Sequence, residues 1–202
     1  LMEESREGEY FPIEEDARGS YILNSKDLNM IRHIDKLAAA GINSFKIEGR
    51  VKTSYYVASV VGAYRRAIDL YYANPDDFSL PREIYDDIEK PSHRRYCTGF
   101  YFGRDPDAQC YDTSKPKQTY EFTALVTGCF DGGAVVEMRN RFKSGDELEV
   151  MSPGINHNRL LKVAKMTDED GNAVEDAMKV QQKIYLYTCL LYTSPSPRDT
   201  ER

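Results

Sequence analysis

The chain has 202 residues, and its 27 Lys and Arg against 33 Asp and Glu give a formal net charge of −6. The mean hydropathy is −0.61, and no uncharged apolar run approaches the roughly 18 residues of a membrane-spanning helix. The acidic balance argues against broad electrostatic binding to nucleic acid but leaves room for a local basic pocket. Four scattered cysteines without a CxxC pair, and only three histidines, favour reduced thiols in a cytoplasmic protein over a zinc site.

The segment 20–41 predicts a strand followed by a helix. Residues 20–24 are a short apolar run, and Asn24 or Ser25 then offers an N-cap, with Asp27 in the first helical turn. Gly41 suits the position just after a helix end, because glycine tolerates a positive φ. The apolar residues at helical spacing between these limits are Leu28, Ile31, Ile34, Leu37 and Ala38.

The next segment repeats this order. Residues 42–50 predict a second strand, and Thr53 or Ser54 caps a second helix that continues to about Tyr72. Strands that alternate with helices favour a parallel sheet. Two such units cannot cover both faces of a parallel sheet, so we expect residues 1–75 to be the C-terminal part of a larger α/β domain.

Residues 76–117 are rich in Pro, Asp, Arg and Lys, which predicts a linker with a short helix. The run His93-Arg94-Arg95-Tyr96 is a basic and aromatic patch in this linker. Contact with RNA is one interpretation of the patch, and a solvated linker is the favoured one.

Residues 118–188 predict a β domain. Asp131-Gly132-Gly133 is a strong hairpin turn, and residues 168–172 form another connection. Five or six short strands with tight turns predict a small closed barrel. The strands are expected at residues 120–128, 133–139, 147–151, 160–166 and 179–187.

Three charged residues of the second predicted strand are the candidate catalytic group. Side chains alternate along a strand, so Lys46, Glu48 and Arg50 share one face while Phe45 and Ile47 share the other. Charged groups on a buried strand are costly unless they line a polar site. In a (β/α)8 barrel that face points inward, and the site lies at the carboxyl ends of the strands.

Arg50 and Lys52 are expected at that mouth, where they could hold a carboxylate or phosphate. Glu48 is placed to accept a proton or to orient Lys46. The alternative interpretation is a buried Lys–Glu pair that only fixes the strand.

The end of the first strand supplies the candidate substrate-binding residues. Asn24 and Ser25 end that strand, Lys26 and Asp27 begin the helix beside it, and Tyr55 lies at the start of the second helix. The free N–H groups at the two helix starts could form anion-binding sites. Ordinary helix capping is the alternative.

Several of these motifs together resemble the U32 peptidase, or collagenase-like, family. The strand Ser44-Phe-Lys-Ile-Glu-Gly-Arg50 is the most informative of them. The resemblance runs from Leu1 to about Tyr187. Its other matching segments are residues 10–16, 24–28, 52–58, 64–69 and 95–103.

The resemblance implies a (β/α)8-like catalytic domain followed by a small β-barrel domain. The family name comes from protease and collagenase activity, whereas several bacterial members resemble RNA hydroxylases. One branch is linked to 5-hydroxyuridine at the wobble position of tRNA with prephenate implicated, and another modifies ribosomal RNA. These members carry an iron–sulfur cluster on four cysteines just upstream of the segment that matches Leu1, and no cysteine here occupies a matching position.

The expected function is therefore that of a prephenate-dependent tRNA uridine hydroxylase, with tRNA and a small prephenate-like anion as partners and no membrane. A U32-type peptidase is the alternative, but Ser25, Ser44 and Ser54 have no nearby histidine in a motif, and HExxH is absent. A third possibility is an RNA-binding module in the β-barrel. Residues 118–188 contain no clustered stripe of basic and aromatic residues beyond Arg139, Arg141 and Phe142, so the support for this possibility is weak.

We expect the chain to be a C-terminal fragment that binds no cluster or metal and is inactive alone. Residues 189–202, which follow the predicted β domain, are expected to be a non-native tail because they resemble a translated sequencing adapter. A genuine Ser/Pro-rich tail is the alternative.

Overall fold

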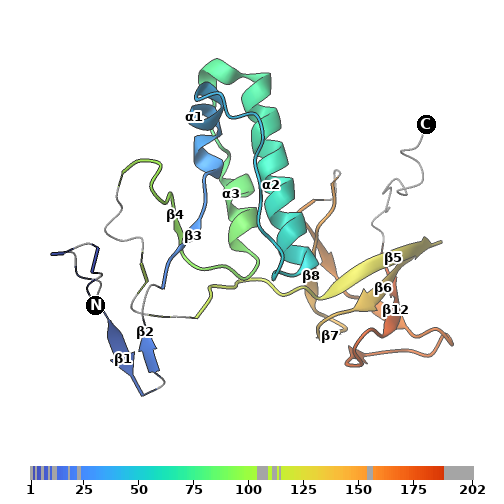
Figure 1. Cartoon of the computed structure of the whole chain (residues 1–202). Helices are drawn as coiled ribbons and strands as arrows, with labels where there is room; N and C mark the ends of the chain where they lie inside the picture. Colours follow the sequence, from blue (N-terminus) through green and yellow to red (C-terminus); the bar gives the residue numbers. More distant parts are fainter. Residues whose placement is uncertain are drawn as a thin grey trace. The chain divides into compact units, whose positions relative to one another are not determined.

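The computed structural model describes residues 2, 4, 5, 7, 8, 10, 13–17, 19–21, 24–103, 109, 110, 113, 115–153 and 157–188. They form two compact units, Leu1–Tyr120 and Glu121–Arg202, each with its own hydrophobic core. The helices lie in the blue-to-green first unit, and the yellow-to-red second unit is built from strands (Figure 1). The predicted mixed α/β class is confirmed. The predicted tail falls outside the described residues.

Two small sheets belong to the first unit. Strands β1 (Glu14–Asp16) and β2 (Gly19–Tyr21) form an antiparallel hairpin. Strands β3 (Asp27–Leu28) and β4 (Tyr96–Cys97) pair in parallel. The strand predicted at residues 20–24 was expected in a parallel sheet, and this pairing is wrong because β2 pairs antiparallel with β1. The connection between them is too short for parallel pairing.

The first helix begins later than its predicted cap. A 3₁₀ helix, η1 (Ile31–His33), leads into α1 (Ile34–Ala39). The N–H of Ile31 donates to Asn29 Oδ1 at 3.0 Å, so Asn29 supplies the local polar contact expected of Asn24 or Ser25. Gly41 follows the helix with a φ of 82°, as predicted.

Helix α2 (Ser54–Ala73) is the longest element of the first unit. Thr53 caps it as predicted, since its side chain accepts from the N–H of Tyr56 at 3.2 Å. The turn η2 (Pro75–Asp77) leads towards α3 (Arg82–Glu89), and both α1 and α3 pack against α2 (Figure 1). The shared core consists of Ile31, Ile34, Val60, Ala63, Ala67, Ile84 and Ile88.

A buried carboxylate joins α2 to α3. The Asp87 side chain is 3% exposed and forms ion pairs with Arg66 of α2 and with Lys90, whose Nζ lies 2.7 Å from Oδ1. A buried charge without partners costs several kcal/mol, so these contacts fix which faces of the helices meet.

Residues 42–49 belong to no strand, which corrects the predicted second strand. Their alternation is real, because Phe45 and Ile47 pack against the helical core. Gly49 lies so close to α2 that an added Cβ would sit 2.8 Å from Val57 Cγ2. Alternation reports which side chains are buried, whereas a strand also needs a neighbouring backbone to hydrogen-bond with.

The predicted linker contributes to the core of the first unit. Tyr96 donates its hydroxyl to Ile88 O at 2.7 Å, and burial raises the pKa of that hydroxyl. His93 is only 1% exposed, and its ring stacks on that of Tyr96 with centroids 4.3 Å apart. The solvated interpretation is therefore wrong for His93, although Arg94 and Arg95 are exposed. The predicted domain limits stay predictions.

The second unit contains a four-stranded antiparallel sheet in the order β10-β12-β6-β5. Its strands are β5 (Ala124–Phe130), β6 (Gly133–Met138), β10 (Lys165–Thr167) and β12 (Lys183–Tyr187). Two further pairs are β7 (Phe142–Lys143) with β11 (Asp176–Ala177), and β8 (Glu147–Val150) with β9 (Arg159–Lys162). Over residues 121–153 and 157–188 these sheets do not join into one closed barrel, so the predicted barrel is not confirmed.

The hairpin between β5 and β6 is confirmed, with Gly132 at a φ of 99° in the predicted turn. The single strand predicted at residues 160–166 is wrong. Val163 separates β9 from β10, because its N–H donates to Asp146 O at 2.8 Å and its carbonyl accepts from Gly145 at 2.7 Å. No helix in the described part of the chain has the length and apolar character to cross a membrane.

The buried carboxylate leads to a stability prediction with a matched control. Asp87→Asn leaves Arg66 and Lys90 without their charge partner, so we expect a loss of about 3 kcal/mol in the free energy of unfolding. Asp86→Asn removes only the exposed pair with Arg82, which should cost less than about 1 kcal/mol. Urea unfolding followed by helical circular dichroism measures both variants. Equal effects would contradict the stabilising role of the buried Asp87 ion pairs.

The second unit leads to a prediction about pH. The Asn172 side chain and N–H donate to the Asp168 carboxylate at 3.1 and 2.8 Å, and they lower the pKa of that group. A lowered pKa stabilises the fold above the ordinary carboxyl value and loses this effect as pH falls through the folded pKa. The difference in melting temperature between wild type and Asp168→Ala should therefore shrink below about pH 4.

Thermal melts between neutral and acid pH measure that difference. Asp170 contributes its backbone N–H to the same turn, so Asp170→Ala is the control. A difference for Asp168→Ala that stays constant into acid would refute the prediction.

Candidate functional site

The pairing of β3 with β4 brings together segments about 70 residues apart in the chain. The N–H of Asp27 donates to Arg95 O at 2.8 Å, and the N–H of Asn29 donates to Cys97 O at 2.9 Å. Asp27 is the first residue of β3, so its side chain lies beside the chain that enters β4. This places a carboxylate next to the basic run before β4.

A charged cluster forms around that carboxylate. Asp27 Oδ2 accepts from the N–H of Arg94 at 2.9 Å and lies 4.0 Å from Lys52 Nζ. The Arg94 guanidinium donates to Ser25 O at 3.2 Å. The side chains of Asp27 and Lys52 are 30% and 31% exposed, so both are within reach of a ligand. We call Asp27, Lys52, Tyr56 and Arg94 the charged cluster.

Lys52 lies two residues before α2, and its ammonium faces three different groups. Besides Asp27, its Nζ donates to Ser92 O at 3.4 Å and lies 4.9 Å from the Tyr56 ring centroid. Burial, and then the Asp27 carboxylate, raise the pKa of Tyr56. The Tyr56 hydroxyl therefore keeps its proton at neutral pH and can donate a hydrogen bond.

The charges of the cluster do not cancel. Lys52 and Arg94 carry two positive charges against one on Asp27, and the positive end of α2 begins at the Thr53 cap beside Lys52. This excess, together with partial exposure, suits an anionic group, and a carboxylate or phosphate is the chemistry that Lys and Arg bind best.

The three predicted catalytic residues are exposed on the segment before α2. Lys46, Glu48 and Arg50 are all exposed, whereas Phe45 and Ile47 are half-buried, so burial alternates as predicted although the segment is no strand. The N–H of Arg50 donates to Glu48 Oε1 at 2.8 Å. Their catalytic role stays a prediction, and a buried Lys–Glu pair is excluded because both side chains are exposed.

The predicted substrate-binding residues separate into two groups. Asp27 and Lys52 come together in the charged cluster, and Ser25 joins it through its carbonyl. Asn24 instead donates its side-chain amide to Cys110 O at 2.7 Å and Thr113 O at 3.2 Å, which ties down the chain after β4. Lys26 and Tyr55 are both half-buried, and they directly precede Asp27 and Tyr56 in the sequence.

Sequence reasoning missed Arg94 and Tyr56 as members of the site. Tyr56 was recognisable only as a packing residue, since it recurs at helical spacing. Arg94 stood in a segment interpreted as a linker, and its partner Asp27 lies 67 residues away. The one local signal was the basic run itself.

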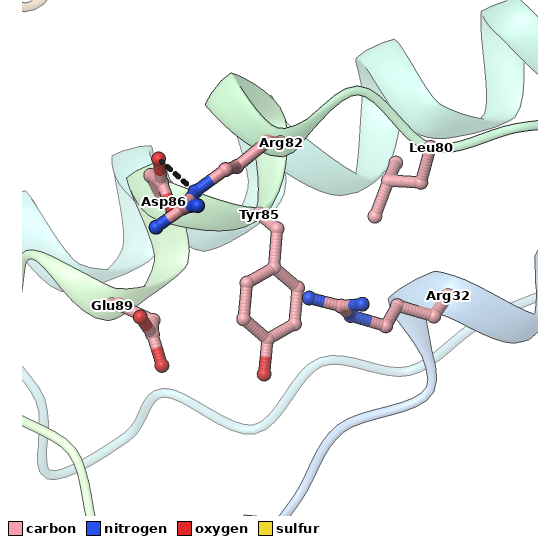
Figure 2. A pocket seen from close by; sticks show the side chains of 6 residues that line it. All are labelled: Arg32, Leu80, Arg82, Tyr85, Asp86 and Glu89. Atoms are coloured by element: carbon pink, nitrogen blue, oxygen red, sulfur yellow. Dashed lines mark ion pairs between the residues drawn. The ribbon is translucent and has the colours of Figure 1, made fainter.

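A pocket of about 380 Å³ lies on the same unit, between η1 and α3 (Figure 2). The Arg32 guanidinium lies 3.9 Å from the Tyr85 ring centroid, and Arg82 pairs with Asp86 at 3.6 Å. Its two arginines are balanced by Asp86 and Glu89. The charged cluster is therefore the stronger candidate for binding an anion.

The three cysteines that the structure describes are too few for an iron–sulfur ligand set, which takes four thiolates. Cys97 is half-buried and Cys110 buried in the first unit, while Cys129 is exposed in the second. Within the described ranges no three His, Cys, Asp or Glu side chains gather in a metal-binding arrangement.

Comparison with known families agrees with the motifs. Residues 1–110 match peptidase family U32, and residues 118–196 match the C-terminal domain of that family. The chain belongs to peptidase family U32. The family resemblance inferred from the sequence is thus confirmed.

Relatives of this U32 chain carry two kinds of name. It is 37% identical to tRNA hydroxylation protein P1 of Bacillus subtilis over 85% of this chain and 43% of that protein. It is 36% identical to tRNA hydroxylation protein P of Escherichia coli over 100% of this chain and 42% of that protein. A collagenase of Porphyromonas gingivalis is 33% identical over 46% of this chain and 22% of its own length. The U32 chain spans less than half the length of these relatives.

Two crystal structures of the C-terminal domain of a U32 peptidase from Geobacillus thermoleovorans are also similar. They are 36% and 37% identical, with TM-scores of 0.33 and 0.32. They cover 35% and 34% of this chain, and 87% and 78% of their own chains.

The Tyr56 hydroxyl reports directly on the charged cluster. In Asp27→Asn the charge that disfavours the phenolate is removed while burial remains, so the pKa of Tyr56 should fall part of the way to its ordinary value. Nuclear magnetic resonance of ¹³C-labelled tyrosine rings measures it, with Tyr56→Phe to assign the signal.

Asp69→Asn is the matched control, because Asp69 lies on the same helix and pairs with Arg65 instead. An unchanged pKa of Tyr56 in Asp27→Asn would show that the carboxylate does not face the hydroxyl.

Proposed function

We propose that this protein takes part in the hydroxylation of tRNA, at the wobble uridine, with a prephenate-like anion as the small-molecule partner. The observation that carries the proposal is the 36–37% identity to two tRNA hydroxylation proteins over 85% and 100% of the chain. The collagenase relative matches less than half of it. The likeness to hydroxylation proteins therefore includes both units.

The charged cluster supports the small-molecule part of the proposal. Prephenate is a dicarboxylate, and Lys52 with Arg94 offers positive charge in excess of Asp27. In this proposal Lys52 and Arg94 bind a carboxylate, Asp27 positions the Lys52 ammonium and the Arg94 backbone, and Tyr56 donates a hydrogen bond. Lys46, Glu48 and Arg50 would supply proton transfer and further contacts from the exposed face of residues 44–50.

We also propose that the first unit belongs to a (β/α)8-like domain of the whole protein and that the second is a small barrel. The parallel pairing of β3 with β4 supports the first part, since parallel strands with helices between them build such domains. An iron–sulfur cluster, as in the related hydroxylases, would take its ligands from outside this chain. When bound, it would supply redox chemistry.

The peptidase alternative has less support from the side chains. His33 packs its ring against Phe102 at 4.6 Å, and His93 is buried with Nδ1 2.5 Å from Arg94 O. A serine or cysteine nucleophile needs a base free to take its proton. Both histidines of the first unit are engaged in packing instead.

A gene deletion with complementation tests the proposed function. We expect the deletion strain to lose hydroxylated uridine from its tRNA, as measured by nucleoside mass spectrometry, and the wild-type gene to restore it. Lys52→Ala should restore about one tenth or less, because a charge-assisted contact to the anion is lost. The control Lys162→Ala removes an exposed lysine of the second unit and should restore the full level.

Unchanged tRNA nucleosides together with lost gelatin cleavage would refute the hydroxylase and favour the peptidase. Full restoration by Lys52→Ala would refute the role given to the charged cluster.

A further inference from the structure

Three consecutive aromatic side chains are exposed directly after β4. Phe100, Tyr101 and Phe102 are 85%, 56% and 53% exposed, and Leu28 beside them is 58% exposed. Single exposed apolar residues are ordinary, whereas a contiguous group of large ones marks a binding surface. We call residues 99–103 the aromatic loop.

The backbone of the aromatic loop has a defined shape. The N–H of Tyr101 donates to Thr98 O at 3.3 Å, and the N–H of Gly103 donates to Phe100 O at 3.2 Å. Gly99 has a φ of 57°, and a Cβ there would lie 3.3 Å from Leu28 Cδ1. Two successive turns packed against β3 therefore hold the three rings at the surface, which lowers the entropy lost when a ligand binds.

The side chains of Lys36 in α1 and His33 in η1 border the aromatic loop. Lys36 Nζ lies 4.7 Å from the centroid of the Phe102 ring, and the His33 ring lies 4.6 Å from it. Arg32, one turn earlier, is exposed and stacks on Tyr85, as Figure 2 shows. Burial and Lys36 lower the pKa of His33, with Arg32 adding to the effect and Asp35 opposing it.

Both groups of residues follow the carboxyl ends of paired parallel strands. The aromatic loop follows β4, and η1 with α1 follows β3. In parallel α/β sheets, ligands bind beyond the carboxyl ends of the strands, where the loops from neighbouring strands meet. The charged cluster, by contrast, lies at the amino end of the same pair, since Asp27 begins β3 and Arg94 precedes β4.

We propose that the aromatic loop and Lys36 of α1 bind a single-stranded RNA segment. Bases stack on the rings of Phe100 and Phe102, and Lys36 contacts a phosphate. This inference rests on the proposed function, because a tRNA base must be unstacked from its neighbours to be modified. Aromatic rings with adjacent cations are how proteins bind single-stranded nucleic acid.

Charge is the reason to prefer RNA over a protein partner. The centres of protein–protein interfaces are depleted in lysine, whereas Lys36 lies directly over the ring of Phe102. A phosphate group beside a stacked base satisfies the ammonium and the ring together. The net charge of −6 for the chain does not oppose this, because the potential that matters is local.

Fluorescence anisotropy with a labelled RNA hairpin that has a single-stranded loop tests the proposal on the full chain. Phe100→Ala and Phe102→Ala should each weaken binding about 10-fold, the usual effect of removing one stacking ring. Tyr72→Ala is the matched control, because Tyr72 is 69% exposed on α2, and its affinity should stay within about twofold. Circular dichroism checks that each variant is folded.

The salt dependence tests Lys36 separately. Lys36→Gln should reduce the slope of log affinity against log salt by about 0.7, the value for one phosphate contact on a single strand. An unchanged slope in this variant would overturn the role of Lys36.

RNA affinity that is unchanged by both phenylalanine substitutions would overturn the proposal. If sedimentation then showed a changed association state, the aromatic loop would be a protein-docking surface instead. Because binding is measured without any reaction, the inference can fail or hold independently of hydroxylation. RNA binding through the loop, with tRNA nucleosides unchanged in the deletion strain, would refute only the proposed function.

Discussion

The Asp87 carboxylate is buried between α2 and α3, and its two cations have to remain beside it. This constraint sets the position of the helices that lead to the candidate site. Helix α2 begins just after Lys52, and α3 leads through Lys90 to Ser92 and Arg94. A shift of one helix along the other would separate Lys52 from Ser92 O and from the Asp27 carboxylate. The ion pair contributes less as net stability than as geometry, because desolvation offsets much of the attraction between buried charges.

Local signals predicted the parts of the fold that depend on neighbouring residues. The Thr53 cap and the helical spacing gave α2, and the turn at Gly132 gave the hairpin of β5 and β6. The errors came where distant segments decide the structure. Asp27 looks like a helix N-terminal residue, but its carboxylate accepts the N–H of Arg94, so the helix begins later. Residues 42–49 have the alternation of a strand, yet their alternation arises from packing on a helical core.

The sequence predicted only part of the candidate site, because the rest depends on contacts between distant segments. The sequence indicated positive and negative residues around positions 24–27 and 46–52, and the structure joins Asp27 to Lys52. The sequence alone could not identify Arg94 as part of the site, because its role follows from the pairing of β3 with β4. Nor could it show that Phe100 and its neighbours are exposed. The two strand ends carry different chemistry as a result. Cations and one carboxylate lie at the amino end, and aromatic rings lie at the carboxyl end.

The claim that the helix pair positions the charged cluster is tested most directly by amide hydrogen exchange in wild type and Asp87→Asn. The variant should lose protection at the N–H groups of Asp27 and Arg94, which bond to Arg95 O and to the Asp27 carboxylate. Amides of the β5–β6 hairpin in the second unit should keep theirs. Unchanged protection at Asp27 and Arg94 in a folded Asp87→Asn variant would contradict it.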